Sequence, residues 1–176
     1  MKCFSTLIVA AAGLLAAPET TTVRADDPAE KGAALADASL REMLVRLGYA
    51  PAEIKSPVGI SMYKIVVERD DWRVIIYASL SGSKARLWLA SPVADLPETG
   101  KVSAAALERL LALNDDLGPT HFGLRGRRVF LNTPMDNVGI TEKRLRTEID
   151  NLAANVKRTS EYWKDLRADK HTAVKK

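Results

Sequence analysis

Cysteine is almost absent from this sequence of 176 residues, since the one cysteine, Cys3, lies near the N-terminus. A chain without a second cysteine forms no intrachain disulfide, so its stability must come from an apolar core. The composition, with 47% apolar and 27% charged residues, is that of an ordinary globular protein. About 150 residues bury roughly 68–70% of the surface that the unfolded chain exposes, which is enough for one core.

Long hydrophobic runs are also scarce. The only continuous one, residues 7–17, is too short to cross a bilayer. Lys2 precedes it and Val23-Arg24-Ala25 follows, a pattern typical of a secretory signal peptide that is cleaved after Ala25. An uncleaved, membrane-associated leader is the alternative. The pattern predicts an exported protein, periplasmic or extracellular, with no membrane span after signal cleavage.

Residue patterns that carry chemistry are missing as well. His121 and His171 have no cysteine partner and no metal-ligand spacing, and the sequence contains no nucleophile elbow or phosphate-binding loop. We interpret the acidic pairs Asp70-Asp71 and Asp115-Asp116 as a turn and a helix end. The sequence therefore predicts no catalytic, cofactor-binding or metal site, no cofactor, and a protein that is not an enzyme.

Charge of one sign is in only slight excess, with a formal net charge of +4. Basic and acidic residues are interspersed through most of the chain, which argues against a nucleic-acid binder. Residues 167–176 are the exception, because basic residues predominate there and few apolar residues could anchor them. We interpret them as a basic flexible tail.

The clearest helical pattern covers residues 141–163. Thr141 is placed to cap the first turn, and Ile140 to pack against the helix as a hydrophobic staple. Charged residues occupy the opposite face. The large apolar residues fall on one face of this long amphipathic helix: Leu145, Ile149, Leu152, Val156 and Trp163.

Two shorter helices are predicted upstream. The first covers residues 37–47, where Ser39 and Glu42 have capping-box spacing, and a start one turn earlier, at Ala33, is the alternative. The second begins after Ser103 and ends before Gly118-Pro119. Both have apolar residues at helical spacing, so each is expected to bury one side.

Alternating apolar residues and turn residues predict five strands. Three follow the first helix and two form a hairpin: residues 60–68, 72–80 and 85–91, and the hairpin over residues 120–135. Prolines predict irregular structure in residues 49–57 and a loop between Pro92 and Pro97. The order is therefore α-β-β-β-α-β-β-α, an α+β fold with an antiparallel sheet packed with helices.

In two of these strands, apolar and polar residues do not alternate strictly. Ile65-Val66-Val67 and Val74-Ile75-Ile76 place apolar side chains on both faces of the sheet. Either both faces of the central strands are covered within the chain, or the second face meets another chain.

This order of elements resembles a known fold. The order of elements and several core and turn segments together resemble the type III secretion chaperone-like fold. The segments look most like its YbjN-type sensory-transduction branch. The resemblance covers residues 35–166. The segments are Leu47-Gly48-Tyr49, Leu110-Leu111-Ala112-Leu113-Asn114-Asp115-Asp116, Phe122-Gly123-Leu124, Val129-Phe130-Leu131 and Tyr162.

The resemblance implies a chaperone-like or regulatory binding domain, often a dimer, without catalytic residues. No functional residue is carried over, because the family has no diagnostic site motif that this sequence matches. Dedicated secretion chaperones are acidic and cytoplasmic, whereas this chain is mildly basic and is predicted to be exported. "Chaperone" is therefore used here for a fold.

Residues and resemblance together predict a non-enzymatic exported binding domain. Its organisation is a signal peptide (residues 1–25), a linker (26–34), the chaperone-like domain (35–166) and the tail (167–176). We expect it to bind a protein or peptide partner through a sheet face, as a homodimer. The candidate partner surface consists of Trp88, expected on a strand at a sheet edge or dimer contact, and the hairpin arginines: Trp88, Arg125, Arg127 and Arg128.

Two alternatives remain open at this point. The first is a small periplasmic enzyme or ligand carrier, which would need an enclosed polar pocket that gathers His121 with an acidic residue. The second is a binder of nucleic acid or anionic surfaces that uses the hairpin arginines and the basic tail, and it predicts strongly salt-dependent binding.

Overall fold

The computed structural model describes residues 32–56, 59–69, 71–98 and 102–166. It confirms the α+β class and the predicted order of elements, with one additional strand, β1. The predicted signal peptide, most of the predicted linker and the predicted tail lie outside the described residues. The elements are α1 (Asp37–Arg46), β1 (Ala52–Lys55), β2 (Ser61–Arg69), β3 (Trp72–Leu80), β4 (Arg86–Asp95), α2 (Ala104–Leu117), β5 (His121–Arg125), β6 (Arg128–Asp136), α3 (Glu142–Arg158), α4 (Ser160–Trp163) and the 3-10 turn η1 (Lys164–Leu166).

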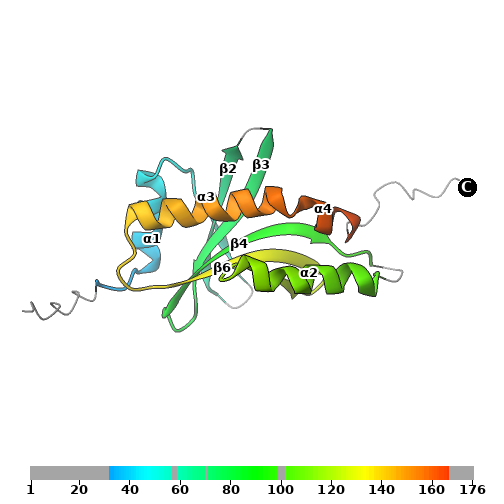
Figure 1. Ribbon diagram of the computed structural model, residues 1–176. Coiled ribbons are helices and arrows are strands. Elements are labelled where there is room, and N and C mark those ends of the chain that lie inside the picture. The colour runs from blue at the N-terminus through cyan, green and yellow to red at the C-terminus, as the bar shows by residue number, and fades with distance from the viewer. Residues whose placement is uncertain (1–31, 57–58, 70, 99–101, 167–176) are drawn as a thin grey trace, which may run out of the picture. The chain divides into compact units, whose positions relative to one another are not determined.

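One antiparallel sheet carries the fold. Its six strands have the order β1-β2-β3-β4-β6-β5, so β1 and β5 are the edges. Helix α2 connects β4 to the edge strand β5, and the chain then returns as β6 beside β4. The described helices lie on one face of the sheet, where α3 packs on β3, β4 and β6 (Figure 1). The described part of the chain therefore has two layers, helices over a sheet.

The core lies between these two layers. Alternate strand residues such as Ile65, Ile76 and Leu89 point towards the helices and are fully buried. The apolar face predicted for the last helix is buried against them, as Leu145, Ile149, Leu152, Val156 and Trp163 show. Among the described helices, none is both long enough and apolar enough to span a bilayer.

Helix α3 begins as predicted but ends earlier. The Thr141 hydroxyl accepts a hydrogen bond from the backbone N–H of Arg144 at 3.2 Å, which confirms the cap. The prediction of one helix to Trp163 is wrong, because the chain breaks at Thr159 between α3 and α4. The Thr159 hydroxyl donates to the carbonyl of Asn155 at 2.7 Å, a contact that bends helices. The break brings Trp163 into the core.

Helix α1 ends as its sequence indicates but begins differently. Ala36 is its N-cap and no side chain caps the first turn, so the predicted capping box is wrong. At the other end, Gly48 has φ +87° and its N–H donates to the carbonyl of Val45 at 2.8 Å, while the N–H of Tyr49 donates to that of Leu44 at 3.1 Å. These two bonds form a Schellman motif, which glycine permits at little steric cost.

Two strand predictions are also wrong, and proline explains both. Residues 49–57 were predicted to be irregular, but Ala52–Lys55 forms β1 and pairs with β2. Strand β4 was predicted to end at Ser91, but it continues through Pro92 to Asp95. The register shifts between Pro92 and Ala94, and such an irregularity is where a sheet tolerates proline.

Asn137 ties the start of the described chain to the end of β6. Its side chain is fully buried, and its Oδ1 accepts a hydrogen bond from the N–H of Leu35 at 3.2 Å. Its Nδ2 donates to the carbonyls of Leu35 at 2.9 Å and Lys84 at 2.8 Å. A β-bridge between Ala34 and Val138 adds to this contact. The segment before α1 is thus fixed to the β3–β4 turn and to β6.

Candidate functional site

The sheet face opposite the helices is not covered by any described element, and we call it the open face. Its side chains come from alternate positions of all six strands, and most are half-buried because neighbouring strands cover their flanks. Its large apolar members are Ile54, Met62, Val66, Ile75, Tyr77, Trp88, Pro92, Phe130 and Pro134.

The uninterrupted apolar runs in β2 and β3 explain why the middle of this face is apolar. Ile65 and Ile76 pair across β2 and β3 and point to the helices, whereas Val66 and Ile75 pair beside them and lie on the open face. Both predicted strands therefore bury one apolar row and present another. Of the two explanations for these runs, coverage within the chain does not hold for the described elements, because all the described helices lie on the other face (Figure 1).

Charged residues surround the apolar ones on the open face. Basic residues outnumber acidic ones, and two ion pairs form among the described residues of this face, Arg86 with Asp136 at 3.7 Å and Arg128 with Asp95. On β2 and β3, Glu68 lies opposite Arg73. The charged members are Lys64, Arg73, Arg86, Arg125, Arg128, Glu68, Asp95 and Asp136.

Trp88 lies on the open face, between Ser79 of β3 and Pro134 of β6. The predicted edge position is wrong, because β4 lies inside the sheet with a paired neighbour on each side. The Trp88 ring meets the His121 ring edge-to-face, with 6.2 Å between centroids and 80° between planes. His121 Nδ1 lies 3.2 Å from the carbonyl oxygen of Pro119. The two rings form an aromatic pair that spans three strands.

Two of the three hairpin arginines, Arg125 and Arg128, lie opposite each other on the open face. The Arg125 guanidinium lies over the Phe130 ring at 5.2 Å and donates to Oδ1 of Asn132 at 3.4 Å, so Arg125 belongs to the open face. Arg128 donates through both Nε and Nη2 to the carboxylate of Asp95. That hydrogen bond, and then the charge of Asp95, raises the pKa of the Arg128 guanidinium.

Arg127 lies in the tight turn between β5 and β6. It is exposed, and its carbonyl accepts a hydrogen bond from Leu96 at 2.7 Å. Gly126 precedes it with φ +59°, as the first central residue of a type II′ turn requires. The structure therefore brings Trp88, Arg125 and Arg128 to the open face, pairs Arg128 with Asp95 there and leaves Arg127 in the turn.

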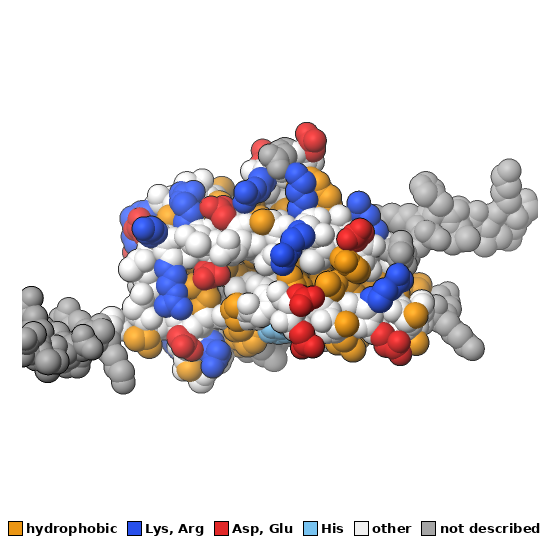
Figure 2. Space-filling model, in the orientation of Figure 1, with side chains coloured by type: hydrophobic (Ala, Val, Ile, Leu, Met, Phe, Trp, Pro, Cys, Tyr) orange, Lys and Arg blue, Asp and Glu red, His pale blue; other side chains and the backbone are white. Residues whose placement is uncertain are grey.

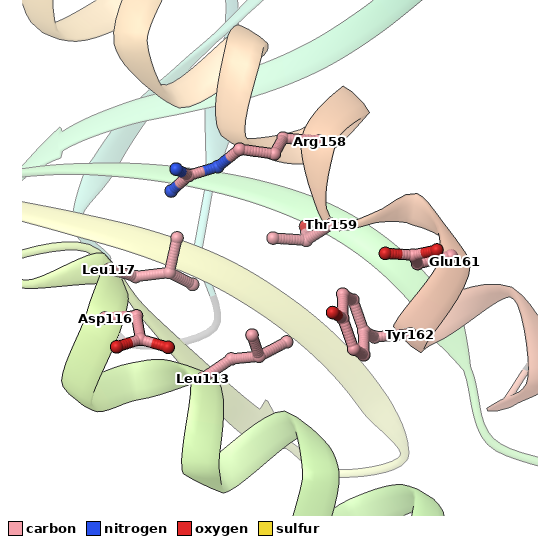
Figure 3. Close-up of a pocket in the computed structure, with 7 residues that line it drawn as sticks. All are labelled: Leu113, Asp116, Leu117, Arg158, Thr159, Glu161 and Tyr162. Atoms are coloured by element: carbon pink, nitrogen blue, oxygen red, sulfur yellow. The ribbon is translucent and has the colours of Figure 1, made fainter.

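A small pocket lies on the helix side, at the break between α3 and α4 (Figure 3). Its volume is about 210 Å³, the size of one or two side chains, and His121 is not part of it. Of its lining residues, Leu117 and Thr159 are buried, whereas Asp116, Arg158 and Glu161 are exposed. The lining residues are Leu113, Asp116, Leu117, Arg158, Thr159, Glu161 and Tyr162.

The exposed surfaces of the helices carry both signs of charge. Figure 2 shows basic and acidic side chains interspersed over α2 and α3. Some of them are paired across elements, as with Arg46 Nε and Glu142 Oε1 at 2.6 Å. Within the part of the chain that the structure describes, no three His, Cys, Asp or Glu side chains are arranged to hold a metal ion. This face has the character of a solvated surface, in contrast to the open face.

Sequence patterns predicted only some of the residues that form the open face. Trp88 and Arg125 were singled out, but Phe130 and Pro134 were not, because the hairpin signal does not say which of its two sides is covered. Strand β1 was missed altogether. The alternation of charged and uncharged residues in Ala52-Glu53-Ile54-Lys55 is a strand signal, but it is short and lies between two prolines.

Comparisons with known proteins find structural likeness only. No protein-family model matches the chain, and no curated protein sequence matches it. The fold is similar to a chain in the crystal structure of the ExsC–ExsE complex, with a TM-score of 0.48 and 19% identity over 69% of this chain and 88% of that chain. It is also similar to a chain in the HopA1–SchA chaperone–effector complex, with a TM-score of 0.46 and 17% identity over 69% and 90%. The function is therefore inferred from the geometry of this chain.

Proposed function

We propose that this chain is an exported, non-enzymatic binding domain that holds a protein or peptide partner against the open face of its sheet and acts as a homodimer. The observation that carries the proposal is an apolar sheet face that no described element covers. Its place in the YbjN branch of the type III secretion chaperone-like fold stays a prediction from the sequence.

The extent of the open face supports an interface. Its large apolar residues come from β1, β2, β3, β4 and β6, and β5 adds His121 and Arg125 at the far edge. Six strands about 4.8 Å apart make this surface roughly 24 Å wide. Monomeric soluble proteins rarely expose a contiguous apolar patch of more than a few hundred Å², and larger patches mark interaction sites.

The shape of the open face favours a macromolecular partner over a small ligand. Small molecules bind in concave pockets that enclose most of their surface. The open face is one side of a sheet, and the small pocket of about 210 Å³ described above lies on the helix side. A protein surface or an extended peptide can cover such a face, with Trp88 and Tyr77 as aromatic contacts in its middle.

A photocrosslinking amino acid tests the site. It replaces Tyr77 at the centre of the open face and, in a matched variant, Leu111, which is 63% exposed on α2. We expect one protein to be crosslinked from the exported fraction of the source cell at position 77 and not at position 111. Binding of that purified protein to the full chain is then measured by calorimetry.

The substitution Ile75→Asp puts a charge on the open face without touching the helix layer. We expect it to weaken the measured binding at least tenfold, while Leu111→Asp leaves binding unchanged. Arg125→Ala should weaken binding and Arg127→Ala should not, because Arg125 lies on this face whereas Arg127 lies in the turn. Equal crosslinking at both positions, or equal binding by the Ile75 and Leu111 variants, would exclude the open face as the binding site.

A further inference from the structure

The two edge strands of the sheet, β5 and β1, differ in whether their outward backbone groups have hydrogen-bond partners. At the β5 edge, the side chain of Asn114 from α2 takes the place of a neighbouring strand. Its Oδ1 accepts a hydrogen bond from the N–H of Phe122 at 2.6 Å, and its Nδ2 donates to the carbonyl of Phe122 at 3.3 Å. The middle of β5 is therefore closed to an added strand.

The β1 edge has no such cover among the described residues. All four residues, Ala52–Lys55, are exposed. The N–H of Ser56 donates a hydrogen bond to the carbonyl of Ile60, so Ser56 and Ile60 form a hydrogen-bonded pair. Hydrogen-bonded and non-hydrogen-bonded pairs alternate along an antiparallel ladder, so Ile54 with Met62 is the next hydrogen-bonded pair. The backbone groups of Glu53 and Lys55 consequently point away from β2. They form a short ladder of donors and acceptors at an open edge.

We propose that this edge pairs with the same edge of a second copy, antiparallel, about a two-fold axis at Ile54. In that register Glu53 lies opposite Lys55 of the second copy, and Lys55 opposite its Glu53. Both are pairs whose backbone groups point outward, so each can exchange two hydrogen bonds. Ile54, which is 37% exposed, meets its own counterpart on the open-face side. The inference rests on the homodimer part of the proposed function.

Charge selects this register over its neighbours. Sliding one strand by two residues, in either direction, places Glu53 opposite Glu53 or Lys55 opposite Lys55. Like charges directly opposite each other in a sheet are destabilising, whereas opposite charges stabilise the pair. A two-fold pairing centred on Ile54 is thus the arrangement in which both charged pairs are favourable, and each copy supplies one member of each pair.

The ladder is short, so the dimer it forms is weak. Four residues on each side bury less than the roughly 1,600 Å² of a standard stable interface. The dissociation constant is therefore best measured by sedimentation equilibrium of the full chain from about ten to several hundred micromolar.

Charge reversal provides the first test. Glu53→Lys and Lys55→Glu each turn two favourable cross-strand pairs into two repulsive ones, and we expect each to weaken dimerisation about tenfold. The double variant restores opposite charges and should return to within about threefold of the parent. Because Glu53 also accepts a hydrogen bond from the Ser61 hydroxyl at 2.9 Å, Ser61→Ala serves as the control and should leave the dimer unchanged.

A disulfide provides the second test. In a Cys3→Ser chain, Ile54→Cys places two thiols at the two-fold axis, where paired Cα atoms lie about 4.5 Å apart, within disulfide range. Leu124→Cys, 57% exposed on β5, is the matched control. We expect mild oxidation to link the Ile54 variant and not the Leu124 variant.

The outcomes separate this inference from the proposed function. A dimer that survives Glu53→Lys, with no preferential linkage through position 54, would overturn the β1 pairing and leave the homodimer in place. A monomer at every concentration would overturn both. Neither result changes the crosslinking test at Tyr77, because that test decides partner binding independently of the dimer.

Discussion

The Asn137 side chain is expected to account for a large part of the stability of the α1 end of the domain. Asn137→Ala removes three hydrogen bonds and leaves the N–H and carbonyl of Leu35 without partners. A lost hydrogen bond costs about 1 kcal/mol, and a buried group left unpaired costs about 1–3 kcal/mol. Leu35 is half-buried and Lys84 is exposed, so water replaces the bond to Lys84. We expect a loss of about 2–3 kcal/mol of unfolding free energy.

Urea unfolding, followed by tryptophan fluorescence, measures this loss. Asn151→Ala is the matched control, because Asn151 is exposed on α3, and we expect it to stay within about 0.5 kcal/mol of the parent. Hydrogen exchange at the Leu35 amide gives a local readout and should accelerate only in the Asn137 variant. A loss below about 0.5 kcal/mol for Asn137→Ala, with unchanged exchange at Leu35, would show that these hydrogen bonds do not hold the segment.

Two further predictions concern other parts of the sheet. Asn114→Ala removes both bonds to Phe122 and should cost about 1–2 kcal/mol in urea unfolding. It should also open the β5 edge, so light scattering should show species larger than those of the parent; an unchanged size would contradict the edge-closing role. Burial, and then the charge of Glu53, raises the pKa of the Tyr63 hydroxyl above its usual value near 10. The unfolded chain therefore loses this proton first, so the stability from the neutral hydroxyl is complete below pH 10 and falls above it. Urea unfolding between pH 8 and about 11 should show a weaker alkaline decline for Tyr63→Phe than for the parent.

The sequence predicted well what depends on periodicity. The buried face of α3 and the whole span of β3 follow from apolar spacing, because a regular element must present its apolar residues to one side. The end of α3 could not be predicted in this way. Trp163 continues the helical spacing, but its Nε1 donates to the carbonyl of Val156 at 3.3 Å, in a packing that a continuous helix would not give. Tertiary contacts decide that boundary.

Proline accounts for the strands that were missed or shortened. Pro51 and Pro57 flank β1, and Pro92 lies within β4, so local propensity argued against strands at both places. In the structure, β4 accommodates Pro92 because the register shifts there, and β1 forms because β2 is already present to pair with it. Neither condition is visible in the residues themselves.

The candidate site was predicted in part for the same reason. The apolar pairs in β2 and β3 indicated a second covered face, and Trp88 was singled out as a surface residue. Which strands are edges depends on the return of β6 beside β4, a long-range pairing that no local pattern specifies. Sequence reasoning therefore placed Trp88 at a sheet edge or a dimer contact, and the edge part is wrong because the edges are β1 and β5.

The edge pairing and the open face are compatible with each other. A second copy that pairs through β1 adds strands in the plane of the sheet, so it widens the open face across two chains and does not cover it. A dimer that stacked sheet on sheet would instead bury Tyr77, Trp88 and their neighbours, and would compete with any partner. The two arrangements therefore predict a different dependence of crosslinking at position 77 on dimerisation, which the Glu53→Lys variant and the protein concentration both test. With edge pairing, crosslinking to the partner at position 77 should persist in that variant. If dimerisation through the open face excluded the partner, crosslinking at position 77 should fall as protein concentration rises, in the parent and the variant alike.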